Sequence, residues 1–129
     1  LPRHGTGHHP RGHLLLRWKF VIPRDIIKAV ANNFHDMAPA TIHEATFCCG
    51  GGGGLLTDDL IELRVKGALP RMEALRNVAD DHGVNFMATI CAICKAQFSK
   101  VLPYYGFDMG MVGGVHQLVS TAIRLGEPT

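Results

Sequence analysis

The sequence lacks long hydrophobic runs. No stretch approaches the roughly 20 apolar residues that a membrane-spanning helix needs, and the largely apolar stretch 84–90 is far too short. The apolar segment Leu14–Leu16 is also too short for the central region of a secretory signal. The sequence therefore predicts neither a membrane span nor a secretory leader.

Acidic residues are absent from the first 24 positions, which hold five basic ones. The remaining residues hold eight basic and all 11 acidic residues, a net charge of −3, although the whole chain carries +2. A slightly acidic body excludes a polybasic nucleic-acid-binding domain. The hydrophobic content of 47% argues against disorder, and 129 residues can bury one core, so a single globular domain is expected.

Cysteine is too scarce for a disulfide scaffold of this length. The four cysteines occur as two pairs, the adjacent Cys48-Cys49 and the spaced Cys91 and Cys94. This usage indicates metal or redox chemistry in a reducing compartment.

The five consecutive glycines, Gly50–Gly54, do not form a nucleotide-binding loop. No Gly-Lys-Ser/Thr follows them. The next helix is expected to begin at Thr57 as a hydroxyl cap, followed by Asp58 and Asp59, which suit a helix N-terminus but would repel phosphate.

Residues 1–17 differ from the rest of the chain in composition. They hold four of the eight histidines, three glycines and two prolines, with no usable apolar period. We interpret this segment as poorly ordered or not native to the fold, and residues 18–129 as one domain.

From residue 18 onward, runs of strand length alternate with helical periodicity. We expect strands over 18–22, 45–47, 84–90 and 111–115. We expect helices over 24–34, 91–102 and 117–125, and two more between Thr57 and Gly83 that are separated at Gly67 and Pro70. This order predicts an α/β fold with a mainly parallel sheet flanked by helices. Ligands of such sheets collect at the carboxyl ends of the strands, where both cysteine pairs are expected.

The Cys91-Ala-Ile-Cys94 segment is expected to open a helix directly after a buried strand. The spacing puts both sulfurs on one helical face, and the helix N-terminus lowers thiol pKa values. The motif alone fits thioredoxin-like redox chemistry, half a zinc site or part of an iron–sulfur site.

The adjacent Cys48-Cys49 pair narrows these choices. Neighbouring cysteines are a poor ligand pair for one zinc ion and form a strained disulfide, but they can bind two different irons of a cluster. Gly50 and Gly51 would let the backbone approach a bulky ligand and point N–H groups toward sulfur. The alternative is that both cysteines are small buried hydrophobic residues beside a flexible loop.

Cys48-Cys49-Gly50 followed by Cys91-x-x-Cys94 resembles the CCG, or cysteine-rich, domain of heterodisulfide reductase catalytic subunits and their relatives. Residues 46–75 and 88–123 resemble more narrowly the DsrK type, the heterodisulfide-reductase-like subunit of the DsrMKJOP membrane complex of dissimilatory sulfur metabolism. The resemblance covers roughly residues 20–125. It implies the C-terminal fragment of a much longer subunit.

The resemblance implies a [4Fe–4S] cluster of the noncubane type, held at a catalytic centre by Cys48, Cys49, Cys91 and Cys94. It implies an oxidoreductase that cleaves a disulfide or trisulfide reductively, or forms one in the reverse direction, on the sulfur-carrier protein DsrC. Electrons would come from quinone-linked membrane subunits, especially DsrM. The subunit would be peripheral, at the cytoplasmic face of the inner membrane, with no span of its own.

The sequence departs from the family pattern in one respect. The family has an early cysteine that should fall near residues 8–16, where none is present. Either this segment is a shifted reading frame or foreign junction, which its composition favours, or His8, His9 or His13 replaces the cysteine. The parent nucleotide sequence distinguishes these explanations. Two other functions stay open: a structural zinc module and a cluster-free assembly domain.

Overall fold

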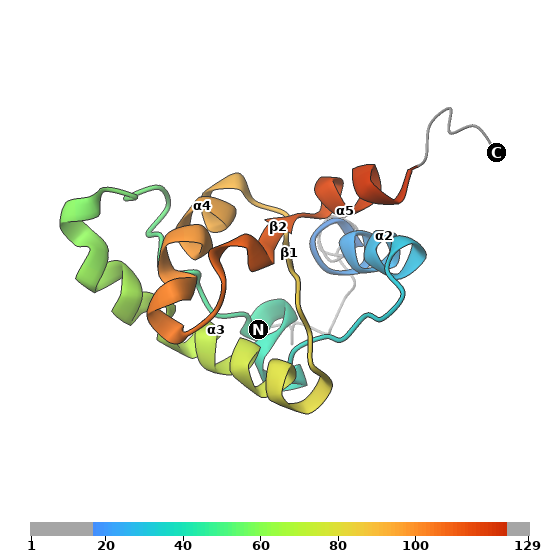
Figure 1. Ribbon diagram of the computed structural model, residues 1–129, viewed down its shortest axis with the longest axis horizontal. Helices are drawn as coiled ribbons and strands as arrows, with labels where there is room; N and C mark the ends of the chain where they lie inside the picture. The colour runs from blue at the N-terminus through green and yellow to red at the C-terminus, as the bar shows by residue number, and fades with distance from the viewer. Residues whose placement is uncertain (1–16, 124–129) are drawn as a thin grey trace, which may run out of the picture.

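The computed structural model describes residues 17–123, which form an α/β domain around a small parallel sheet (Figure 1). The main elements in chain order are α2 (Ile22–Val30), α3 (Ile61–His82), β1 (Met87–Thr89), α4 (Ala92–Val101), β2 (Val112–Gly114) and α5 (Val115–Ala122). Helices α3 and α4 lie on one side of the sheet, and α5 and α2 lie on the other (Figure 1). The predicted fold class is confirmed.

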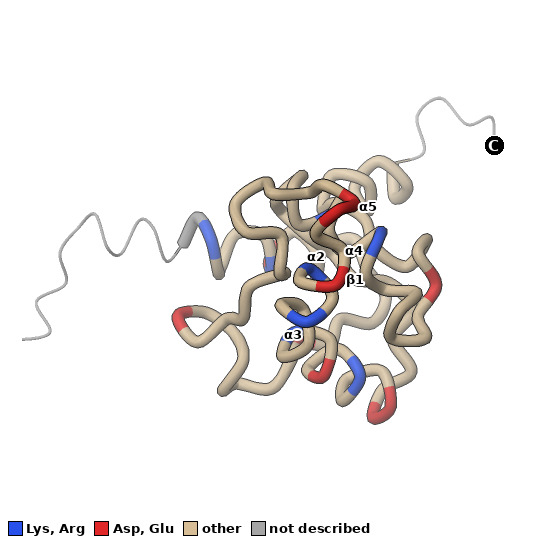
Figure 2. Tube along the Cα trace, turned by 90° about the vertical axis from the view of Figure 1, so that its left-hand side faces the viewer, with Lys and Arg blue, Asp and Glu red and all other residues tan. Residues whose placement is uncertain are grey.

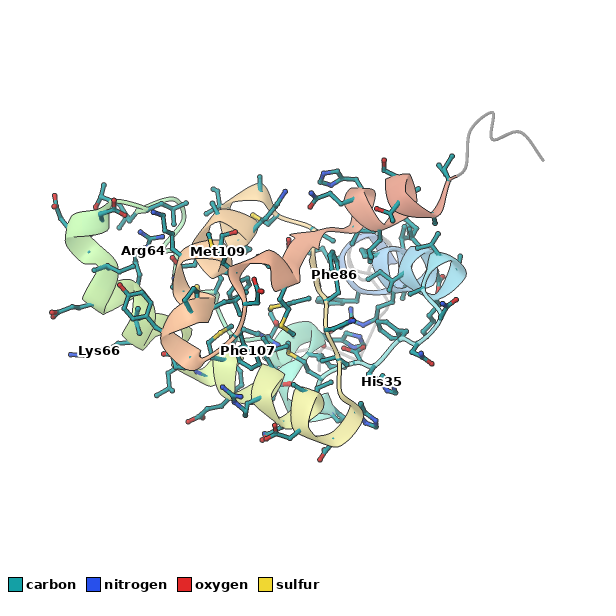
Figure 3. All side chains as sticks on the ribbon, in the orientation of Figure 1. His35, Arg64, Lys66, Phe86, Phe107 and Met109 are labelled. Atoms are coloured by element: carbon teal, nitrogen blue, oxygen red, sulfur yellow. The ribbon has the colours of Figure 1, made fainter. Side chains whose placement is uncertain are left out.

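The two strands pair in parallel with Met87 opposite Val112 and Thr89 opposite Gly114. Both are shorter than the predicted strands. Residues 84–86 lie outside the ladder, Met111 ends a 3₁₀ turn, and Val115 already begins α5. At Gly113 a Cβ atom would lie 2.6 Å from Cζ of Phe86, so a larger residue there would require this ring to move (Figure 3). The helices that follow the strands, α4 and α5, agree with the predicted helices over 91–102 and 117–125, although both are shorter.

Helix α3 is continuous from residue 61 to residue 82, so the prediction of two helices divided at Gly67 and Pro70 was wrong. Pro70 removes the N–H that would bond to the carbonyl of Lys66, which normally breaks a helix. Tertiary packing compensates, because the helix buries a continuous apolar face: Ala68, Met72, Ala74, Leu75 and Val78. Gly83 ends the helix in a left-handed conformation with φ of 66°, as predicted.

The start of α3 also differs from the prediction. Thr57 precedes a 3₁₀ turn, Asp58–Leu60, that leads into the helix. The Thr57 hydroxyl makes no capping hydrogen bond to the described backbone, so its predicted role as a cap was wrong.

The predicted strands over 18–22 and 45–47 were both wrong. Residues 17–21 form a π-helical turn that runs directly into α2, and Pro23 occupies the first turn of that helix, where no N–H is needed. Ala45 ends a 3₁₀ turn, His43–Ala45, and the backbone after it is extended but is not part of a strand. A short apolar run is compatible with both helix and strand, and its packing against neighbouring elements determines which one forms.

The core lies between α3, α4 and the sheet. Its most buried side chains are Ala68, Met72, Leu75, Phe98, Val101 and Leu102. Four polar residues, Arg64, Arg71, Thr89 and Gln97, are also buried. Within residues 17–123, every buried side-chain nitrogen or oxygen has a hydrogen-bond partner.

From Asp25 onward acidic and basic residues are interspersed along the described chain, whereas residues 17–24 carry only basic ones (Figure 2). Within residues 17–123, no helix combines the length and apolar character needed to cross a membrane. The His-rich head, apart from Arg17, lies outside the described residues, as do His8, His9 and His13.

Candidate metal centre

The adjacent cysteines lie in an extended and glycine-rich segment, residues 46–54, here called the CC loop. Cys48 is exposed and Cys49 is buried. The Gly50 N–H donates to Cys48 Sγ at 3.3 Å, and the Gly51 N–H donates to Cys49 Sγ at 3.4 Å. The Gly50 N–H is the main cause that lowers the pKa of the Cys48 thiol. The loop therefore favours thiolate at Cys48, and thiolate is the form that binds metal.

The CC loop reaches this position by a close backbone crossing over α3. Gly50 has φ of +89°, and a Cβ atom there would lie 2.7 Å from both the Ala68 nitrogen and the Arg64 oxygen. A Cβ atom at Gly67 would lie 3.2 Å from the Gly50 Cα atom. Gly67 therefore admits the loop to the helix surface and does not interrupt the helix.

The second cysteine pair opens α4 at the carboxyl end of β1, as the sequence predicted. Cys91 is the N-cap residue and is exposed, while Cys94 lies in the first turn and is half-buried. The backbone N–H groups of Cys94 and Ile93 lower the pKa of the Cys91 thiol. The Cys91 side chain makes no capping hydrogen bond to the described helix. The N–H groups of Ile93 and Cys94 therefore act on the Cys91 sulfur through their electrostatic field.

Contacts between thiols join the two pairs. Burial is the main cause that raises the pKa of Cys94 to about 12, followed by contact with Cys49 and then with Cys91. Cys48 contacts Cys49 in turn. The order of neighbours is therefore Cys48, Cys49, Cys94 and Cys91, and all four are free thiols.

This row of sulfurs does not surround a single point. Within residues 17–123, no three His, Cys, Asp or Glu side chains converge closely enough to hold one metal ion. Cys49, Cys91 and Cys94 instead line one cavity of about 1010 Å³ between α2, α3 and the sheet. A row of soft sulfur donors beside a cavity suits an iron–sulfur cluster, which distributes its ligands over several irons.

A buried arginine, Arg71, supports the start of the CC loop and the segment before it. Its side chain is 6% exposed and donates to the carbonyl oxygens of Thr41, at 2.9 Å, and Phe47, at 3.3 Å, and to the Thr46 hydroxyl. Desolvation is the main cause that lowers the Arg71 pKa, while Asp36 and Cys94 act in the opposite direction. Arg71 is thus a buried positive charge near Cys94.

Sequence reasoning placed the four cysteines and Gly50 and Gly51 together but missed Arg71, Gln97 and Gly67. One signal was available for the arginine. Arg64 and Arg71 are seven positions apart, on the same face of α3 as its apolar residues, where an exposed charge is not expected. Gln97 likewise follows Cys94 by three residues, which places it on the face of α4 that carries the thiol.

The pKa shifts predict an order of alkylation for the metal-free chain. Iodoacetamide at neutral pH should modify Cys48 and Cys91 first, because their pKa values are lowered and both are exposed. Cys94 should react last, because a pKa of about 12 leaves roughly a thousandfold less thiolate than an ordinary cysteine. Peptide mass spectrometry measures the order. Denatured chain is the control, in which all four should react at similar rates, and equal rates for Cys91 and Cys94 in the native chain would contradict this geometry.

Comparison with known proteins found two curated relatives. The chain is 46% identical over 101 residues to the Hdr-like menaquinol oxidoreductase iron-sulfur subunit 2 of Archaeoglobus fulgidus. It is 47% identical over 103 residues to the Hdr-like menaquinol oxidoreductase iron-sulfur subunit of Archaeoglobus profundus. The chain is similar to part of an Hdr-like iron–sulfur subunit. No protein-family model matches the sequence, and no solved structure matches it.

The similarity covers 78% and 80% of this chain but only 18% of each relative. The chain thus spans about a fifth of the length of the curated relatives it matches. Their names support the heterodisulfide-reductase-like resemblance seen in the sequence, and they do not single out the DsrK type.

Proposed function

We propose that this chain is an iron–sulfur domain of a heterodisulfide-reductase-like oxidoreductase. Cys48, Cys49, Cys91 and Cys94 would hold a [4Fe–4S] cluster of the noncubane type. The observation that carries the proposal is the row of four thiols, which joins a glycine turn to a helix N-terminus beside one cavity. The names of the two relatives give independent support for an iron–sulfur role.

Residues of this chain would orient the four cysteine ligands and favour their thiolate form. Gly50 and Gly51 direct N–H groups at the two sulfurs of the CC loop, and the first turn of α4 favours the Cys91 thiolate. Arg71 offsets part of the negative charge near Cys94. Such partners tune the potential of a bound cluster through hydrogen bonds and local charge. The cluster, when bound, supplies a store for single electrons.

The reaction we propose is the reductive cleavage of a disulfide or trisulfide. One disulfide accepts two electrons and two protons and yields two thiols. A quinol releases the same number of electrons and protons when it is oxidised to quinone, so one quinol balances one disulfide. A trisulfide accepts four electrons and four protons, yields two thiols and hydrogen sulfide, and requires two quinols. The relatives are named menaquinol oxidoreductase subunits, which supports a quinol as the electron source.

The finer proposal is a DsrK-type subunit of a DsrMKJOP complex. Its disulfide substrate would be carried by the sulfur-carrier protein DsrC, and its electrons would come through the membrane subunit DsrM. This subunit would be peripheral, at the cytoplasmic face of the inner membrane, and bound there through its membrane partners. The motifs quoted from the sequence support these partners, and the exposed Cys48 and Cys91 would leave the cluster's edge open to a protein carrying a disulfide.

Anaerobic reconstitution with ferrous iron and sulfide tests this function. The expected result is about four irons and a similar amount of acid-labile sulfide per chain, with a broad visible absorbance. One zinc ion per chain with no colour would instead indicate a structural zinc module. A chain that binds neither metal would be an assembly domain, and both of these outcomes would overturn the proposal.

A further inference from the structure

Gln97 is a fully buried polar side chain beside the cysteines. Its exposed fraction is 0%, and it lies on α4 between the core residues Phe98 and Val101 and the thiol of Cys94. A primary amide in a core is costly unless its hydrogen bonds are made. Its presence there therefore calls for partners that hold it.

Gln97 makes those hydrogen bonds with both the CC loop and α3. Its Nε2 donates to the Cys49 carbonyl oxygen at 3.0 Å and to the Arg64 carbonyl oxygen at 3.1 Å. Its Oε1 accepts from Arg64 Nε at 2.8 Å. Both amide N–H groups and the amide oxygen are thus engaged, and this fixes the orientation of the side chain.

Arg64 completes the connection from the other side. It is 3% exposed and points from α3 toward α4, whereas the exposed Lys66 on the same helix points away (Figure 3). Its Nη1 also donates to the Thr57 carbonyl oxygen at 3.3 Å, just beyond the glycine run. The amide of Gln97 therefore joins three elements: the CC loop, α3 and the helix that carries Cys94.

We propose that Gln97 is a positioning residue that sets the separation between the two cysteine pairs. Gln97 belongs to α4, three residues after Cys94, and its amide group binds the Cys49 carbonyl oxygen. The side chain therefore fixes the distance between the sulfurs of Cys49 and Cys94. The proposal rests on the cluster function proposed above. Groups that orient metal ligands typically change metal affinity 10- to 100-fold when they are removed.

Substitution of Gln97 by methionine tests the proposal, because methionine keeps the length but removes all three hydrogen bonds. In the full chain, reconstituted with ferrous iron and sulfide, the chelator concentration that removes half of the iron should fall about tenfold. The electron paramagnetic resonance spectrum and the midpoint potential of the remaining cluster should both change. The matched control is Gln117→Met, which removes the acceptor of the hydrogen bond from the Gly114 N–H, at the end of β2, and should leave both unchanged because Gln117 makes no described hydrogen bond with the CC loop or α4.

Two further variants keep the test decisive. Gln97→Glu keeps the acceptor for Arg64 but removes the donors to Cys49, and it should alter the spectrum in the same way. Gly67→Ala leaves the buried amide intact but moves the CC loop away from α3 by a few tenths of an ångström, and alanine favours the helix. A change in its spectrum supports the role of loop position, and an unchanged spectrum there would count against it.

The two possible failures can be told apart. If the wild-type chain binds no iron, the cluster function fails. If the wild-type chain binds a cluster and either Gln97 variant holds one with the wild-type spectrum and potential, Gln97 supports only the fold and the positioning role is wrong. Should neither Gln97 variant fold, an unchanged spectrum in Gly67→Ala would overturn the proposal.

Discussion

Replacing Cys49 or Cys91 with alanine should abolish cluster retention, with the iron content falling from about four per chain to near zero. Cys49 is a sulfur in the middle of the row and contacts both Cys48 and Cys94, while Cys91 ends the row at the helix N-terminus. Loss of either leaves an iron without its thiolate. Iron and sulfide analysis after anaerobic reconstitution, together with the visible absorbance, measures the effect.

A suitable control for these variants is Met109→Ala. Met109 is 60% exposed, and its substitution removes a sulfur atom that is not a thiolate. It should retain full iron content. If both cysteine variants retain a complete cluster, the assignment of Cys49 and Cys91 as ligands is wrong.

Gly50→Ala should cost about 3 kcal/mol or more of folding free energy and also prevent cluster binding. A left-handed conformation costs a non-glycine residue roughly 1–2 kcal/mol. The added Cβ atom would also lie 2.7 Å from two backbone atoms of α3, and such overpacking costs about 1–3 kcal/mol more. Because backbone atoms cannot rotate away as a side chain can, the CC loop itself must move. Urea denaturation of the metal-free chain measures the loss of folding free energy, and the iron content after reconstitution measures the loss of cluster binding.

Gly53→Ala separates the two contributions to that cost. Gly53 also has a positive φ, +72°, but a Cβ atom there would have no described atom within 4 Å. Its substitution should therefore cost only the conformational term, about 1–2 kcal/mol, and leave cluster binding intact. Equal losses for Gly50→Ala and Gly53→Ala would show that the close crossing over α3 is not important.

Capping residues and apolar periodicity in the sequence predicted the helix ends that depend on only a few neighbouring residues. The α4 start after an apolar run, the glycine stop at Gly83 and the helix after β2 all depend on capping and periodicity within a few residues. The predicted strand at 18–22 failed because a short apolar run carries no period long enough to separate helix from strand. The predicted break at Pro70 failed because the buried face of α3 outweighs the lost hydrogen bond.

The cysteines of the candidate site were predictable, and the residues that support them were not. Two closely spaced pairs separated by about forty positions identify themselves by residue type and spacing alone. Gln97 and Arg71 belong to residue types that are usually on the surface. Their helical spacing places them on the inner faces of α4 and α3, but their hydrogen bonds to the CC loop join segments far apart in the sequence. A glycine within a helical pattern, Gly67, was visible in the sequence. The close approach of Gly50 that requires it is a contact between distant segments and was not visible there.

Iron K-edge X-ray absorption of the reconstituted chain tests most directly whether both cysteine pairs share one cluster. The expected spectrum shows sulfur as the main first-shell neighbour of iron and a second shell of nearby iron atoms, which requires a cluster. In Cys49→Ala and Cys91→Ala the iron edge should be reduced to near background, and any residual iron should show no iron–iron shell. Iron surrounded mainly by nitrogen and oxygen with no iron–iron shell in the wild-type chain would contradict the account.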